Sequence, residues 1–185
     1  MAARSTMAYI INILEKKVHD EGNAIWDAAD LQDYLDMHRT HIRRRKLKKD
    51  VDEKLYFVEF GLLEGTYARS TDDDAAWDDD STVIKIWDSA SADATAATPD
   101  GWNLIDGRFW WDADQNEDYS LDAISYDLEG AIAECLEELA MDPDKAVRWS
   151  RGGVMYTHYH LLEMARYHRS LSGPKSQTLV RSYRT

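Results

Sequence analysis

The fold class is decided by residues 102–111, which read WNLIDGRFWW. Two short runs of apolar and aromatic residues surround the pair Asp106-Gly107, and an Asp-Gly pair in such a setting is typical of a two-residue hairpin turn. The stretch therefore predicts two antiparallel strands, at residues 102–105 and 108–112.

Two more strands are predicted before this hairpin. Residues 55–63 and 82–87 are rich in β-branched and aromatic residues, which are favoured in strands. Because no helical pattern interrupts these four segments, they indicate an antiparallel sheet of about four strands.

Helices are expected before and after this sheet. Apolar residues recur at helical spacing from Met7 to Val18, and again in residues 27–42, 120–141 and 155–171, with Ser120 as the expected cap of the third helix. The sequence therefore predicts an α+β fold in which the sheet is flanked by N-terminal and C-terminal helices.

We expect a single α+β domain. The domain should comprise residues 1–172, with helices at 6–49, a sheet at 55–112 and further helices at 120–171. We expect the basic segment that follows, 173–185, to be a mobile tail.

Charge is distributed unevenly along the chain. The 185 residues carry a formal net charge of −13, but residues 51–147 alone carry 26 acidic and 5 basic residues. Residues 1–50 have a net charge of +2 and residues 148–185 a net charge of +6. The middle of the chain must therefore project a strongly negative field, which serves solubility or attracts a basic partner.

The favoured hypothesis is a non-enzymatic interaction protein that occupies a basic, nucleic-acid-binding site on a larger protein. Its sharpest form is a phage- or plasmid-type inhibitor of a host defence nuclease, such as a restriction or CRISPR effector. Since Trp110 and Trp111 are adjacent on one predicted strand, one of them should face outward, and we take Trp111 as an anchor for the partner. The candidate partner-binding residues are Asp72, Asp73, Asp74, Asp78, Asp79, Asp80, Asp112, Asp114, Asp118, Glu134, Glu137, Glu138 and Trp111.

Two other function classes remain open. A structural or assembly protein, for example of a virion, would use the basic tail for contacts between subunits. An enzyme ranks third because no catalytic spacing is present, although a metal-dependent hydrolase that uses the Asp clusters is not ruled out. No catalytic residue and no cofactor are predicted.

Residues 112–120, DADQNEDYS, resemble the oxygen-ligand spacing of a calcium loop. The candidate ligands are Asp112, Asp114, Asn116 and Asp118. The motif fails where a sharp turn requires glycine, which is Glu117, and where a bidentate glutamate is needed, which is Ala123. We therefore predict a connecting loop rather than a metal site.

The basic run at residues 43–49 is predicted to extend the helix of residues 27–42. The net charge argues against direct nucleic-acid binding unless the basic side chains gather on one face. The histidines lack a third metal ligand recognisable in the sequence, and Cys135 is expected to be a buried apolar residue.

The compartment is inferred from the apolar runs and the cysteine content. The longest early apolar run, residues 7–11, is too short to span a membrane. A single cysteine fits a reducing compartment. We expect a cytoplasmic protein, in its own cell or in the cytoplasm of an infected host, with no membrane partner.

Overall fold

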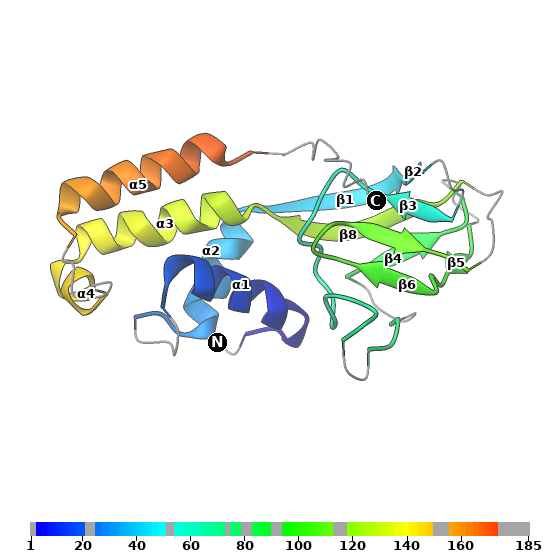
Figure 1. Ribbon diagram of the computed structural model, residues 1–185, viewed down its shortest axis with the longest axis horizontal. Coiled ribbons are helices and arrows are strands. Elements are labelled where there is room, and N and C mark those ends of the chain that lie inside the picture. The colour runs from blue at the N-terminus through cyan, green and yellow to red at the C-terminus, as the bar shows by residue number, and fades with distance from the viewer. Residues whose placement is uncertain are drawn as a thin grey trace, which may run out of the picture.

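The computed structural model describes residues 3–20, 25–50, 54–72, 75–78, 83–89, 94–112, 118–149 and 156–173. Figure 1 shows an elongated molecule with helices at one end, the helical lobe, and strands at the other end, the β lobe. The helices are α1 (Ala8–Val18), α2 (Ala28–Met37), α3 (Leu128–Met141), α4 (Pro143–Arg148) and α5 (His158–Leu171), and a 3-10 turn (Ser5–Met7) precedes α1. The strands are β1 (Arg39–Lys46), β2 (Lys48–Lys49), β3 (Leu55–Phe57), β4 (Lys85–Trp87), β5 (Ala96–Ala97), β6 (Gly101–Asn103), β7 (Arg108–Trp110) and β8 (Ser120–Tyr126).

Local chemistry sets the helix boundaries. Asp27 caps α2 by accepting hydrogen bonds from the backbone N–H groups of Ala29 and Asp30, and the Asp30 carboxylate accepts a hydrogen bond from the Asp27 N–H. Asp127 caps α3 in a similar way, through the Gly130 N–H. Helix α1 ends where His19 takes a left-handed conformation with φ of 56°.

The β lobe consists of two antiparallel sheets of four strands each. Their strand orders are β1-β8-β4-β5 and β2-β3-β7-β6. Only Leu47 separates β1 from β2, and only residues 98–100 separate β5 from β6, so the chain passes from one sheet to the other at both edges. The apolar faces of both sheets enclose one core, which includes Tyr56, Ile86 and Phe109.

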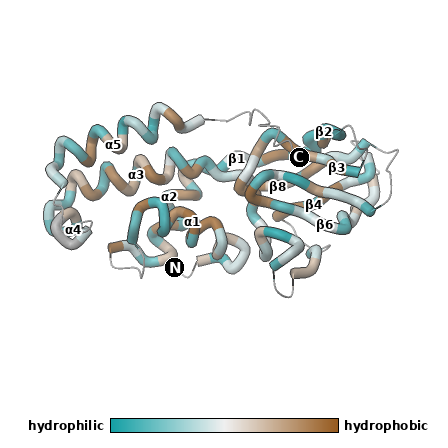
Figure 2. Tube along the Cα trace, in the orientation of Figure 1, coloured by the Kyte–Doolittle hydropathy of each residue, from teal (hydrophilic) through white to brown (hydrophobic). Residues whose placement is uncertain are grey.

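The helical lobe has a separate core. Residues of α1, α2, α3 and α5 contribute to it, among them Leu14, Leu35, Cys135 and Leu161, all of which are fully buried. Figure 2 shows hydrophobic residues alternating with hydrophilic residues along α3 and α5, as expected for helices that bury one side. Strands β1 and β8 pair with each other; β1 directly follows α2, and β8 directly precedes α3. The two strands therefore join the two lobes (Figure 1).

The predicted fold class is confirmed, because the chain has helices at both ends and antiparallel sheets between them. The predicted pair of antiparallel strands is also present, since Trp102 pairs with Phe109 and Asn103 with Arg108, but the predicted two-residue turn is wrong, because the four residues 104–107 connect the strands. The strands at 55–63 and 82–87 are shorter than predicted, and the strands form two sheets rather than one.

The prediction that residues 43–49 continue a helix is wrong. Helix α2 ends at Met37, and residues 39–46 form strand β1 along β8. Residues 39–46 form a strand because they pair with β8. Leu121 and Ala123 of β8 face the β-lobe core, and Ile42 lies opposite Ala123 and packs into the same core. The basic side chains of β1 thereby remain outside.

The predicted helix at residues 120–141 begins later than expected. Residues 120–126 form β8, and α3 starts at Leu128 after its cap, Asp127. Leu121 and Ile124 fit a helical stripe with Leu128, but Leu121 and Ala123 also fit the two-residue period of a strand. Ser120 therefore lies in a strand and caps no helix; its hydroxyl donates to the Ser89 carbonyl.

Candidate functional site

The acidic residues of the loop after Ser70 lie beside strand β6. The Ser70 N–H donates to the Trp102 carbonyl, and the Asp72 carboxylate accepts from the Arg69 N–H at 2.9 Å. Asp78 follows Trp77, whose ring contacts Trp102 edge-on at a centroid distance of 5.4 Å. The four other predicted acids of this region, Asp73, Asp74, Asp79 and Asp80, lie outside the described residues.

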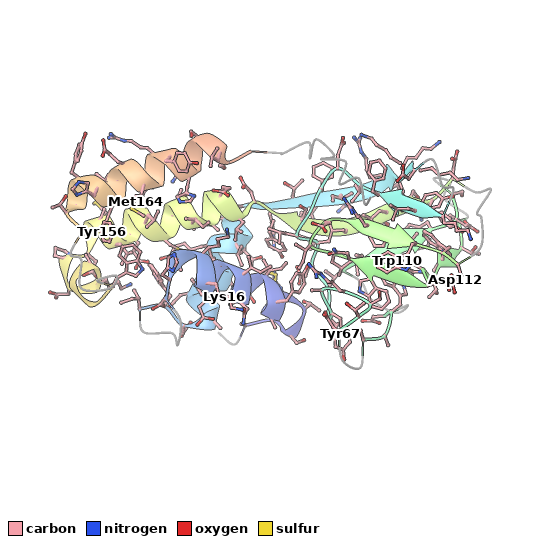
Figure 3. The ribbon with its side chains drawn as sticks, viewed as in Figure 1. Lys16, Tyr67, Trp110, Asp112, Tyr156 and Met164 are labelled. Carbon is pink, nitrogen blue, oxygen red and sulfur yellow. The ribbon has the colours of Figure 1, made fainter. Side chains whose placement is uncertain are left out.

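The acids near residue 112 lie at the end of β7. Figure 3 shows Asp112 next to Trp110 at the end of the β lobe that is farthest from the helices. The Asp112 N–H donates to the Asp100 carboxylate at 2.7 Å, and the Asp112 carbonyl accepts from the Lys54 ammonium at 2.9 Å. Asp112 is exposed to solvent. Asp118 is also exposed but forms an ion pair with Lys46 at 2.7 Å.

Three predicted acids of the β lobe are exposed, and their carboxylates form no ion pair within the part of the chain that the structure describes. Within the described ranges, no lysine or arginine forms an ion pair with Asp72, Asp78 or Asp112. Asp112 follows β7, and the segment before Asp72 is bonded to β6 through the Ser70 N–H and the Trp102 carbonyl. The sheet that contains β6 and β7 therefore determines the position of Asp112 and of the segment before Asp72.

The glutamates of α3 differ in place and in partners. Glu134 and Glu137 both accept hydrogen bonds from the Arg169 guanidinium of α5, at 3.1 and 2.7 Å. These two bonds raise the pKa of Arg169. A single acidic face that contained all the candidate residues would have to include these glutamates, but α3 belongs to the helical lobe and Arg169 pairs with both of them there.

Glu138 serves packing inside the helical lobe. Its carboxylate accepts hydrogen bonds from Trp26 Nε1 at 2.7 Å, from the Tyr34 hydroxyl and from the Lys145 ammonium. Burial opposes ionisation of Glu138, but these donors outweigh it and lower its pKa. We therefore assign Glu138 a structural role that joins α2, α3 and α4.

Trp111 does not face outward as predicted. Its side chain is 6% exposed, it stacks on Tyr119 at a centroid distance of 4.3 Å, and it contacts Tyr56 edge-on. Its Nε1 donates to the Thr98 carbonyl at 3.0 Å. The indole thus belongs to the β-lobe core, while its neighbour Trp110 is only partly buried.

The described residues contain no group of three or more His, Cys, Asp or Glu side chains placed to hold a metal ion. Asp114 and Asn116 of the calcium-loop candidate lie outside the described residues, and Asp118 is bound to Lys46. Burial raises the pKa of the Cys135 thiol, and Cys135 is fully buried in the helical-lobe core. This environment fits the predicted apolar role and suits no thiolate chemistry.

A buried polar network, which we call the junction network, connects the two lobes. Glu64 is 1% exposed, and it accepts hydrogen bonds from Arg4 Nε at 3.1 Å, Thr6 Oγ1 at 2.6 Å and the Tyr126 hydroxyl. Arg4 also binds Asp36 through both terminal nitrogens. The sequence did not predict this network, because its members come from segments that are distant in the sequence.

A groove of about 390 Å³ lies beside the junction network. Its walls include His38, Arg39, Leu62, Tyr126 and Glu129. Glu129 is bound to His168 at 2.7 Å, and His38 faces Glu134 at 3.4 Å. The Glu129–His168 pair joins α3 to α5, whereas His38 Nε2 makes no hydrogen bond among the described residues. Neither pair places a nucleophile next to a base.

Among the described residues, no helix has both the length and the apolar character needed to cross a membrane. No protein-family model matches the chain, and no curated protein or solved structure is significantly similar to it.

Proposed function

We propose that this protein is a non-enzymatic interaction protein, and that the acidic loops of its β lobe occupy a basic, nucleic-acid-binding site on a larger protein. The observation that carries the proposal is the exposure of the Asp72, Asp78 and Asp112 carboxylates without an ion-pair partner among the described cations. An inhibitor of a host defence nuclease is the sharpest form of this function.

Unpaired carboxylates are suited to this task because they retain their full field. A cluster of one sign accelerates the encounter with an oppositely charged site, and it repels nucleic acid that competes for that site. Acids that are paired within the molecule, such as Glu134 and Glu137, contribute far less to such a field.

The described segments next to Asp72 and Asp78 contact the β lobe, and such contacts reduce the entropy cost of binding. Trp77 packs on Trp102 and on Phe109, whose ring is fully buried, and the segment before Asp72 bonds to β6. The backbone next to Asp72 and Asp78 is therefore held against the sheet by these contacts.

The direct test is competition with DNA. The partner is captured from the native cytoplasm at 50 mM salt, and its binding to a labelled duplex is then measured with increasing amounts of the protein. The wild-type protein should displace the duplex, and Asp78→Lys/Asp112→Lys should not.

The matched control is Asp33→Lys/Glu163→Lys, which makes the same change in net charge at exposed positions of the helical lobe. It should displace the duplex as well as the wild type does. Equal competition by both double variants, or no competition by the wild type, would rule the proposal out.

An assembly protein is the second candidate, and one observation favours it. Tyr159 and Tyr167 of α5 are each 61% exposed, Met141 is 77% exposed and Leu171 is 38% exposed. An outer helix surface of this kind suits contacts between subunits. Sedimentation velocity at several protein concentrations decides this case, since Tyr159→Ser/Tyr167→Ser should then dissociate the assemblies.

A further inference from the structure

Strand β1 gathers basic side chains on one face of its sheet. Directly opposite residues of paired strands point to the same side, and Ile42 and Ala123 both point into the core. Residues one position away on β1 therefore point outward. The outward row contains Arg39, His41, Arg43, Arg44 and Lys46.

A β-bulge adds one cation to this row. The register of β1 against β8 shifts between Ile42 and Arg45, so Arg43 and Arg44 together oppose Asp122. Arg44 has φ of 47°, a left-handed conformation that is costly for a residue with a side chain. The Asp122 carboxylate holds it there by accepting from the Arg44 N–H at 2.5 Å.

The bulged arginine is stacked on an aromatic ring. The Arg44 guanidinium carbon lies 3.8 Å from the centroid of Trp87, and Lys85 Nζ lies 5.1 Å from the same ring. Asp122 fixes Trp87 as well, because Trp87 Nε1 donates to it at 2.9 Å. Asp122 thus orients both the cation and the ring.

Two polar groups of this face lack partners. Arg44 Nη1 is buried and has no hydrogen-bond partner among the described residues, which is unusual for a guanidinium nitrogen. Arg43 is exposed and forms no ion pair with any described acid. Arg43 can donate to an anionic ligand from the surface, whereas Arg44 Nη1 is buried and the Arg44 guanidinium is already paired with Asp122 through Nε at 3.7 Å.

We propose that this face, made of the outward row of β1 with Lys85 and Trp87, binds single-stranded nucleic acid. Cations spaced along a strand follow a phosphate backbone, and a guanidinium stacked on an aromatic ring offers a planar surface to a base. Alternate residues on a strand are about 6.8 Å apart, so the row from Arg39 to Lys46 covers several nucleotides. Arg39, Arg44 and Lys46 of this row form ion pairs with Asp36, Asp122 and Asp118, so a phosphate backbone would have to compete with these acids. Arg43 and Lys85 form no ion pair with a described acid, and the proposal therefore rests mainly on them and on the Arg44–Trp87 stack.

A charged edge strand also protects a sheet against pairing with another chain. That role requires neither the strained conformation at Arg44 nor the ordered contact between Arg44, Asp122 and Trp87. This inference does not rest on the proposed function, which concerns other loops and a protein partner.

The test is fluorescence anisotropy with labelled 12-nucleotide oligothymidylate, oligouridylate and a 12-base-pair duplex at 50 mM salt. The single strands should bind more tightly than the duplex. If four phosphates are contacted, affinity should fall about 50-fold between 50 and 200 mM salt.

Arg43→Glu/Lys85→Glu should weaken binding at least tenfold, and Trp87→Ala should weaken it as well. The matched control is Lys16→Glu/Lys17→Glu, which makes the same charge change at exposed positions of α1 and should bind within twofold of the wild type. Thermal melting of each variant shows whether the fold is intact.

Several results would overturn the inference. These are no binding of either single strand at 50 mM salt, an equal loss of affinity in both double variants, or tighter binding of the duplex. Displacement of the oligonucleotide by poly-aspartate at equal charge would also overturn it, because the face would then be a site for acidic protein.

Discussion

Arg4 forms a bidentate ion pair with Asp36, in which Nη1 donates to Oδ2 at 2.9 Å and Nη2 donates to Oδ1 at 2.8 Å. The same guanidinium reaches the buried Glu64 through Nε. One side chain from the start of the chain therefore joins α2 to the segment that runs along β8. The integrity of the junction between the two lobes depends on it.

Arg4→Met should destabilise the protein by about 3 kcal/mol. Glu64 would remain buried without its cation, and removing one partner of a buried ion pair costs about 3–5 kcal/mol. The low end applies because Arg4 is partly exposed. Urea unfolding measures this, and Arg4→Met/Glu64→Gln should recover part of the loss; an unchanged midpoint in Arg4→Met would contradict the role of the network.

Asp36 should make stability depend on acid pH. The hydrogen bond from Arg4 is the main cause that lowers the pKa of Asp36. A group with a lowered pKa in the folded state contributes stability that is complete above its unfolded pKa of about 3.9 and is lost as pH falls through the folded pKa. The free-energy difference between wild type and Asp36→Asn should therefore shrink as pH falls below about 4; a constant difference down to pH 2 would contradict this.

Trp111→Ala should cost about 3–5 kcal/mol, because it removes a large side chain from the β-lobe core. The control Tyr159→Ala changes an exposed aromatic and should stay within about 0.5 kcal/mol. Chemical unfolding distinguishes the two. A small cost for Trp111→Ala would mean that Trp111 is a surface residue after all.

Gly130→Ala should destabilise the protein although alanine favours helices. A Cβ atom at Gly130 would overlap the His38 imidazole, which packs on this turn of α3. We expect a net loss of about 1–3 kcal/mol from overpacking, against a gain of about 1 kcal/mol in helix propensity. If His38→Ala/Gly130→Ala is more stable than Gly130→Ala, the overlap is the cause; equal stability would argue against it.

The sequence predicted secondary structure best where the conformational preference of neighbouring residues matches the structure that they adopt in the fold. The Asp106-Gly107 pair predicted the hairpin because turn chemistry is local, although residues 104–107, rather than these two alone, connect the strands. The caps Asp27 and Asp127 are likewise local, although the sequence pattern indicated Ser120 as the cap of the third helix and not Asp127. Strand β1 could not be predicted in this way, since its basic residues form a strand only because β8 is alongside.

The candidate site was predictable in composition but not in arrangement. Acidic loops follow from counts along the chain, and Asp72, Asp78 and Asp112 are indeed exposed. The pairing of Glu134 and Glu137 with Arg169 depends on the packing of α3 against α5, and no sequence spacing reveals that contact. The same holds for Trp111, because two adjacent tryptophans leave open which one is buried.

The central claim is that the acidic loops of the β lobe form the binding surface. The most direct measurement is the association rate constant with the captured partner at 50 and 300 mM salt, for wild type, Asp78→Lys/Asp112→Lys and Asp33→Lys/Glu163→Lys. The account predicts that the loop variant associates at least tenfold more slowly at 50 mM salt, that this gap narrows at 300 mM because salt screens exposed charges, and that the control variant matches the wild type. Equal rates for the two double variants at 50 mM salt would contradict it.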